Sequence, residues 1–131
     1  MKKHTNKEKT ASNEGYHCQG RIWLNGSDGT FLAYGRVILL ERIQQFGSIA
    51  KAAKSMEMSY KHAWDLVDSM NRQADQPLVS KASGGKGGGG TTLTERGIQA
   101  IGAYWAMDAR FQNYLAEETR RFMAEYRPEQ A

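Results

Sequence analysis

Two short apolar stretches, joined by only a few residues, constrain the fold of this chain more than any other feature. Apolar residues recur at helical spacing in both, at Ile49, Ala52, Ala53 and Met56 and then at Ala63, Leu66, Val67 and Met70. Each stretch opens on a serine that can cap a helix, Ser48 or Ser59. We therefore predict two short helices, over residues 48–56 and 59–72, and the small alanine side chains allow them to cross closely.

Two short helices with a tight turn and small residues at their crossing are typical of a helix-turn-helix. Glu57 stands in the turn, where such motifs usually have glycine. A left-handed conformation costs a non-glycine residue on the order of 1 kcal/mol, which tertiary packing can absorb. We therefore expect the second helix to be a recognition helix that contacts double-stranded DNA.

The outward face of the second helix, opposite its apolar face, carries Lys61, Asp65, Asp68 and Arg72. In this interpretation Lys61 reads guanine O6 and N7, and Asp65 accepts a hydrogen bond from cytosine N4. The alternative is that Lys61–Asp65 and Asp68–Arg72 are ordinary surface ion pairs, and that Trp64 is half-buried packing. The candidate DNA contacts in the two helices are Ser48, Lys51, Ser59, Tyr60, Lys61, His62, Trp64 and Asp65.

A glycine-rich run over residues 84–90 lies between two β-prone segments, residues 78–81 and 91–93. It does not fit a P-loop, because Gly87 follows Lys86 where Ser or Thr is required. After a helix-turn-helix, such a hairpin is typical of the wing of a winged helix, which touches phosphates; a plain flexible hairpin is the alternative. The candidate contacts here are Lys81, Ser83, Lys86 and Thr91.

The remaining segments predict a mainly α fold with a small β component. Residues 21–24 are β-prone and are followed by two turn signals, at Asn25-Gly26 and Asp28-Gly29. A helix should follow and end at Gly47. The predicted parts are therefore a disordered basic arm (1–15), a winged helix-turn-helix domain (16–93), a long helix (94–127) and a tail (128–131).

The last helix, capped by Thr94, is too long for one small domain to cover, at roughly 48 Å for ~1.5 Å per residue. Apolar residues follow a heptad seam along it, interrupted by Asp108 and Glu118. Its first half suits packing against its own domain, and its second half suits a partner helix. We therefore expect a homodimer whose interface includes Ile101, Tyr104, Trp105, Phe111, Leu115 and Phe122.

Composition excludes several other classes of protein. The net charge of +4 permits an anionic partner. Cys18 is the single cysteine, which excludes an internal disulfide framework and suits a reducing cytoplasm. No apolar run is long enough for a membrane span. The histidines and Cys18 lack metal-ligand spacing, and no serine lies in a nucleophile elbow. We expect no metal, no catalytic residues and no enzyme.

From about Gly20 to Leu115 the chain resembles the N-terminal DNA-binding domain of the molybdate-responsive transcriptional regulators (ModE), within the winged-helix group shared with LysR-type regulators. The run SYKHAW, the glycine-rich loop and LTERG carry the likeness. The resemblance implies a dimeric regulator whose recognition helix starts at Ser59 and whose wing is Ser83 to Gly90. It also implies that the long helix and the N-terminal strand pair two subunits.

Members of that family continue into C-terminal molybdate-binding modules, whereas this chain ends at Ala131. We therefore expect no oxyanion pocket and no cofactor within these residues. The leading prediction is a sequence-specific, homodimeric transcriptional regulator. One alternative is a non-specific architectural DNA-binding protein. The other is an interaction module that works with a separate molybdate-binding or other effector protein.

Overall fold

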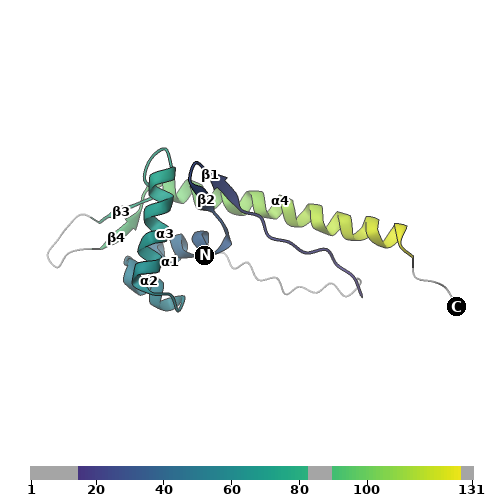
Figure 1. Ribbon diagram of the computed structural model, residues 1–131, viewed down its shortest axis with the longest axis horizontal. Coiled ribbons are helices and arrows are strands. Elements are labelled where there is room, and N and C mark those ends of the chain that lie inside the picture. Colours follow the sequence, from purple (N-terminus) through teal and green to yellow (C-terminus); the bar gives the residue numbers. More distant parts are fainter. Residues whose placement is uncertain (1–14, 83–89, 128–131) are drawn as a thin grey trace. The chain divides into compact units, whose positions relative to one another are not determined.

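The computed structural model describes residues 15–82 and 90–127. Within these ranges the fold is mainly helical with two small antiparallel sheets, as predicted (Figure 1). The chain divides into two compact units. The first, here the core unit, is Ile22–Ala106; the second, here the strap unit, consists of the described residues of Met1–Arg21 and Met107–Ala131.

The core unit begins with a hairpin of β1 (Leu24–Gly26) and β2 (Gly29–Leu32). The β-prone run at 21–24 therefore lies mostly ahead of the first strand, and one of the two turn signals, Asn25-Gly26, is inside β1. The other turn signal makes the turn, with Gly29 at a positive φ of 85°. A side chain distant in sequence holds this register, because Gln73 accepts a hydrogen bond from the Asp28 N–H and donates one to the Thr30 carbonyl.

Helix α1 (Tyr34–Phe46) supplies the centre of the core. Its fully buried side chains are Val37, Leu39, Leu40 and Ile43, and each such side chain contributes roughly 1.5–3 kcal/mol when it leaves water. The helix ends at Gly47, whose φ of 69° is left-handed and whose N–H donates to the Ile43 carbonyl. The predicted glycine stop is therefore confirmed.

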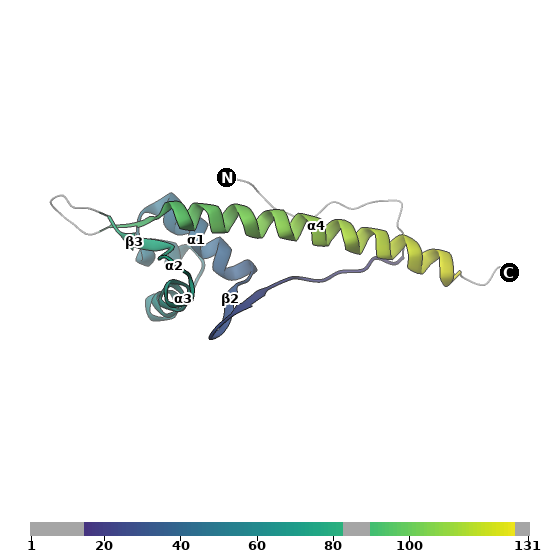
Figure 2. The ribbon, with the colours of Figure 1, turned by 90° about the horizontal axis from the view of Figure 1, so that it is seen from above.

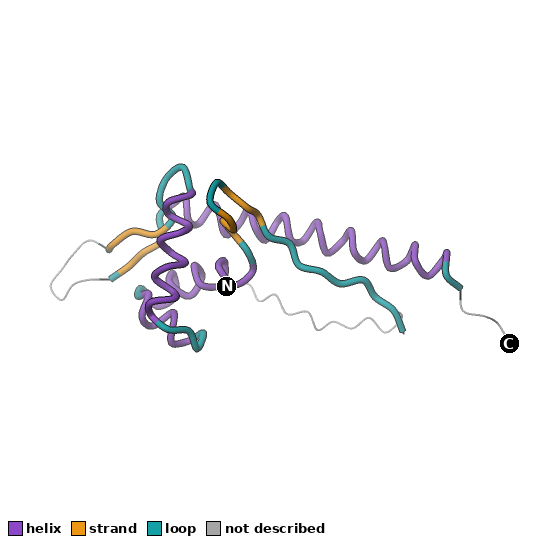
Figure 3. Tube along the Cα trace, viewed as in Figure 1, coloured by secondary structure: helices purple, strands orange, loops and turns teal. Residues whose placement is uncertain are grey.

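Helices α2 (Ile49–Ser55) and α3 (Tyr60–Gln73) follow within one residue of the predicted bounds. The alanines predicted at their crossing, Ala52 and Ala53, are buried, and so is Ala63 on the predicted inner face of α3. Arg42 of α1 also holds α2, because its guanidinium donates to the Ser55 hydroxyl at 2.7 Å. The gathering of the first three helices is visible in Figure 3, where helices are purple.

Strands β3 (Val79–Lys81) and β4 (Thr91–Leu93) form the second sheet, with Val79 opposite Leu93. Helix α4 (Glu95–Glu125) follows, and Thr94 caps it by accepting the Gly97 N–H at 3.0 Å. A Cβ at Gly97 would overlap the Leu78 carbonyl, so only glycine allows the helix to start this close to β3. Figure 2 shows β3 beside the start of α4.

The first turns of α4 complete the core unit. Tyr104 is 1% exposed, and its hydroxyl donates to the Ile22 carbonyl at 2.9 Å. Trp105 packs edge-on against Tyr104, and its indole N–H donates to the buried Glu41 carboxylate at 2.7 Å. A hydrogen bond of this kind offsets part of the cost of burying a carboxylate.

In the strap unit, an extended segment, Gly15–Arg21, lies along the second half of α4, and we call it the N-terminal strap. The Cys18 N–H donates to the Thr119 hydroxyl at 2.8 Å, and Thr119 in turn donates to the Leu115 carbonyl. Tyr16 packs edge-on against Phe122.

Among the helices in the described residues, none is long and apolar enough to span a membrane.

Candidate nucleic-acid interface

The connection between α2 and α3 is a tight turn stabilised by backbone hydrogen bonds. The N–H groups of Met56 and Met58 both donate to the Ala53 carbonyl, at 2.9 and 3.0 Å. Glu57 adopts a φ of 55°, the left-handed conformation expected from its place in the turn. The turn thus keeps helix-turn-helix geometry without its usual glycine, and α3 starts immediately after it.

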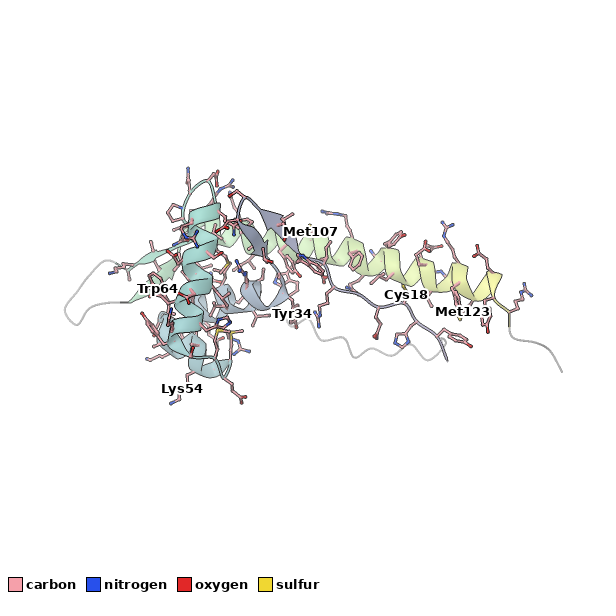
Figure 4. The ribbon with its side chains drawn as sticks, viewed as in Figure 1. Cys18, Tyr34, Lys54, Trp64, Met107 and Met123 are labelled. Carbon is pink, nitrogen blue, oxygen red and sulfur yellow. The ribbon has the colours of Figure 1, made fainter. Side chains whose placement is uncertain are left out.

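The first two turns of α3 expose large side chains. Tyr60 is 55% exposed and Trp64 is 46% exposed, and the Lys61 side chain is 83% exposed. The opposite face, with Ala63, is buried. This half of the helix therefore packs against the core on one face and exposes the other face to solvent. In Figure 4 the Trp64 side chain projects from α3.

The exposed face also contains two ion pairs along the helix. Lys61 Nζ lies 3.1 Å from Asp65 Oδ2, and Arg72 Nε lies 3.0 Å from Asp68 Oδ2. The hydrogen bond to Asp68, followed by that to Asp28, raises the pKa of Arg72 above its ordinary value. The surface pairs considered as the alternative are therefore present. Exposed pairs of this kind contribute about 0–1 kcal/mol, so Lys61 can exchange its partner at little cost.

Both predicted serine caps are present. The Ser48 hydroxyl oxygen accepts from the Lys51 N–H, and the Ser59 hydroxyl oxygen accepts from the His62 N–H, each at 3.0 Å. Each hydroxyl keeps its own proton for donation to an acceptor such as a phosphate oxygen. All four candidates lie at the starts of α2 and α3, and the side chains of Lys51 and His62 are exposed there.

The second hairpin is joined to the start of α2 through the backbone. The Thr91 N–H donates to the Gly47 carbonyl at 3.0 Å, which brings half-buried Thr91 next to the Ser48 cap. Lys81, at the end of β3, is exposed. The other two candidates of this hairpin, Ser83 and Lys86, lie outside the described residues, as does the basic arm before Gly15.

Asn71 is a structural residue of this surface that the sequence patterns missed. Its side-chain oxygen accepts from the N–H groups of Leu78 and Val79, at 2.8 and 3.2 Å, and its amide donates to the Val79 carbonyl at 3.0 Å. One side chain of α3 thereby pairs with the edge of β3, which fixes the second hairpin relative to the recognition-helix candidate. Helical periodicity carries no signal for such a contact.

The residues predicted to join two subunits fall into two groups. Tyr104 is in the core, Trp105 is hydrogen-bonded to Glu41, and Ile101 is half-buried, so the first half of α4 packs on its own unit as the alternative had it. In the second half, Phe111 and Leu115 contact the N-terminal strap around Gly20, and Phe122 remains 46% exposed. The sequence pattern had not indicated that a strap covers part of this seam.

No protein-family profile matches the chain, but sequence comparison finds a class of molybdenum-related regulators and binding proteins. The chain is 43% identical to molybdenum transport protein ModE of Azotobacter vinelandii, over 77% of this chain and 37% of that protein. It is 46% identical to molybdenum-pterin-binding protein MopB of Rhodobacter capsulatus, over 67% of this chain and 33% of that protein.

A third relative is the DNA-binding transcriptional dual regulator ModE of Escherichia coli strain K12, which is 46% identical over 53% of this chain and 26% of that protein. The predicted resemblance to ModE is thus supported at the level of homologous sequence. The chain spans about a quarter to little more than a third of the length of these relatives.

Proposed function

We propose that the chain is a DNA-binding transcriptional regulator that inserts the first half of α3 into the major groove. The exposed start of α3, with Tyr60, Lys61 and Trp64 behind a tight turn from α2, carries the proposal. An α-helix about 10–12 Å across fits a major groove about 12 Å wide, and the N-terminal residues of a recognition helix reach the base edges. The name of the Escherichia coli relative supports the same function.

The second hairpin acts as a wing in this proposal. Lys81 contacts a phosphate from one side of the recognition helix, and Lys51 contacts a phosphate from α2. Such contacts orient the protein on the duplex without reading its sequence. The hydrogen bonds from Thr91 to Gly47 and from Asn71 to β3 support the assignment, because they hold the hairpin at a fixed position relative to α3.

A homodimer is the second part of the proposal. Phe122 of α4 and Tyr126, the residue just after the helix, stack with ring centroids 5.2 Å apart and are both about half exposed, and a second subunit would bury them. A symmetric dimer requires two half-sites about 34–36 Å apart, or a multiple of that distance. Sedimentation equilibrium tests the dimer directly, and a footprint with a single half-site would contradict it.

The relatives' names also refer to molybdenum, so we propose that the chain regulates molybdenum-related genes rather than catalysing a reaction. We further propose that a separate effector protein cooperates with the chain in the response to molybdate. Genome-wide footprints of the bound DNA, taken with and without molybdate, test the role. A set of sites with no relation to molybdenum metabolism would contradict it.

The recognition helix is tested by Lys61→Ala, with Lys51→Ala as the matched control. Loss of a base contact should weaken binding to a selected duplex by about 1–3 kcal/mol and relax specificity at one position. Loss of a phosphate contact should weaken binding to all duplexes alike and make it less salt-dependent. Wild-type affinity of Lys61→Ala for the selected duplex would refute the assignment.

A further inference from the structure

The exposed start of α3 has two chemically different rows of side chains. Tyr60 and Trp64 are one helical turn apart and form an apolar row, which we call the aromatic row. Lys61 and Asp65, also one turn apart, form the ion-paired row. The two rows lie side by side, about 100° apart around the helix axis.

The core does not require the aromatic row. The inner face of α3 is supplied by Ala63, Val67 and Met70, which are buried, whereas the two aromatic side chains are about half exposed. A large apolar surface left in water on a lysine-bearing face is a recognition feature more often than a packing feature. We therefore expect the aromatic row to contact an apolar group in the groove that α3 enters.

The major groove offers one apolar group, the C5 methyl of thymine; its other features are hydrogen-bond donors and acceptors. Base faces are stacked in a duplex and are closed to aromatic side chains. Resting on the proposed DNA-binding function, we propose that Tyr60 and Trp64 read thymine methyl groups. The ion-paired row reads polar edges beside them.

The spacing of the aromatic row limits which thymines it can reach. Four residues of helix advance about 6 Å, close to two base-pair steps of about 3.4 Å each. The contacted thymines should therefore lie within about two steps of one another in each half-site. Thymines elsewhere in the site should be replaceable at no cost.

Deoxyuridine provides the test, because it pairs like thymine and lacks only the methyl group. A duplex is first selected from a random library by the full wild-type chain, and each thymine is then replaced singly by deoxyuridine. The wild type should bind about fourfold more weakly for each contacted methyl that is removed. Anisotropy titrations measure each ratio of affinities.

Variants of the chain then identify the side chain that reads the methyl. Trp64→Ala should bind the thymine duplex more weakly and lose its sensitivity to deoxyuridine at one position, whereas Trp64→Phe should keep that sensitivity. Lys51→Ala should weaken binding to both duplexes equally and preserve the wild-type ratio. Circular dichroism verifies that each variant is folded, which the exposure of Trp64 favours.

The outcomes separate this inference from the proposed function. Equal affinity of the wild type for thymine and deoxyuridine duplexes would overturn the reading of methyl groups and leave DNA binding intact. Wild-type sensitivity to deoxyuridine that persists in both Trp64→Ala and Tyr60→Ala would also overturn it. Absence of any enriched duplex and of any binding at low salt would instead refute the DNA-binding function itself.

Discussion

Replacing Asn71 with alanine should lower the free energy of unfolding by about 2–4 kcal/mol. The Asn71 side chain makes hydrogen bonds with three backbone groups of Leu78 and Val79, residues that are only 1% and 5% exposed. A buried backbone group left without a partner costs about 1–3 kcal/mol, and water entering the vacated space recovers part of that cost. The loss is large against a typical total stability of about 5–15 kcal/mol.

Urea denaturation followed by circular dichroism measures this loss, at one fixed protein concentration because self-association stabilises by mass action. Asn113→Ala is the matched control, since Asn113 is exposed on α4 and alanine favours a helix there. Asn71→Asp should lie between Asn71→Ala and the wild type, because it keeps the acceptor and loses the donor. If Asn71→Ala is as stable as Asn113→Ala, the reasoning is refuted.

Three further predictions concern other contacts. Gly97→Ala should destabilise the chain strongly, because the new Cβ overlaps the Leu78 carbonyl. Gly102→Ala, with open space around it, should instead raise the free energy of unfolding by up to about 1 kcal/mol. Equal urea midpoints for the two variants would contradict this. Thr119→Val should speed amide hydrogen exchange in the N-terminal strap, and unchanged exchange would disprove the anchor. The hydrogen bond from Arg96 lowers the pKa of Asp75, so the pair stabilises above the ordinary Asp pKa and is lost as the pH falls through the lowered value. Arg96→Gln should return that pKa toward normal in an NMR titration, and a fixed midpoint would argue against the pair.

The elements that the sequence predicted well depend on short-range chemistry. Ser48 and Ser59 define the starts of α2 and α3 because a cap requires a side-chain oxygen within three residues of the N–H that it accepts. Gly47 ends α1, and Glu57 adopts the left-handed turn, for similarly local reasons. Rotation around the helix axis also indicated the exposed face of α3, since one face of the helix had to be buried.

The features that the sequence patterns missed depend on partners far along the chain. The register of the first hairpin is selected by Gln73, some 43 residues beyond Thr30, and β3 is held by a side chain of α3. The seam of α4 shows the same effect. Its periodicity indicates an apolar face that must be buried. Residues of the core unit bury this face at Tyr104, and the N-terminal strap contacts it at Leu115. Periodicity identifies a buried face and carries no information about which segment buries it.

The contacts of α3 explain how its exposed rows can act as a rigid reader. Its middle is buried through Val67 and Met70, and its last turns are hydrogen-bonded to both hairpins, through Asn71 to β3 and through Gln73 to the β1–β2 turn. The end of the helix that is fixed in this way is the one away from the proposed DNA contacts. These distant hydrogen bonds therefore hold the helix, while the exposed side chains at its start remain free to change partners. Asn71→Ala should consequently reduce discrimination between duplexes, even though the Asn71 side chain touches no base in the proposed complex.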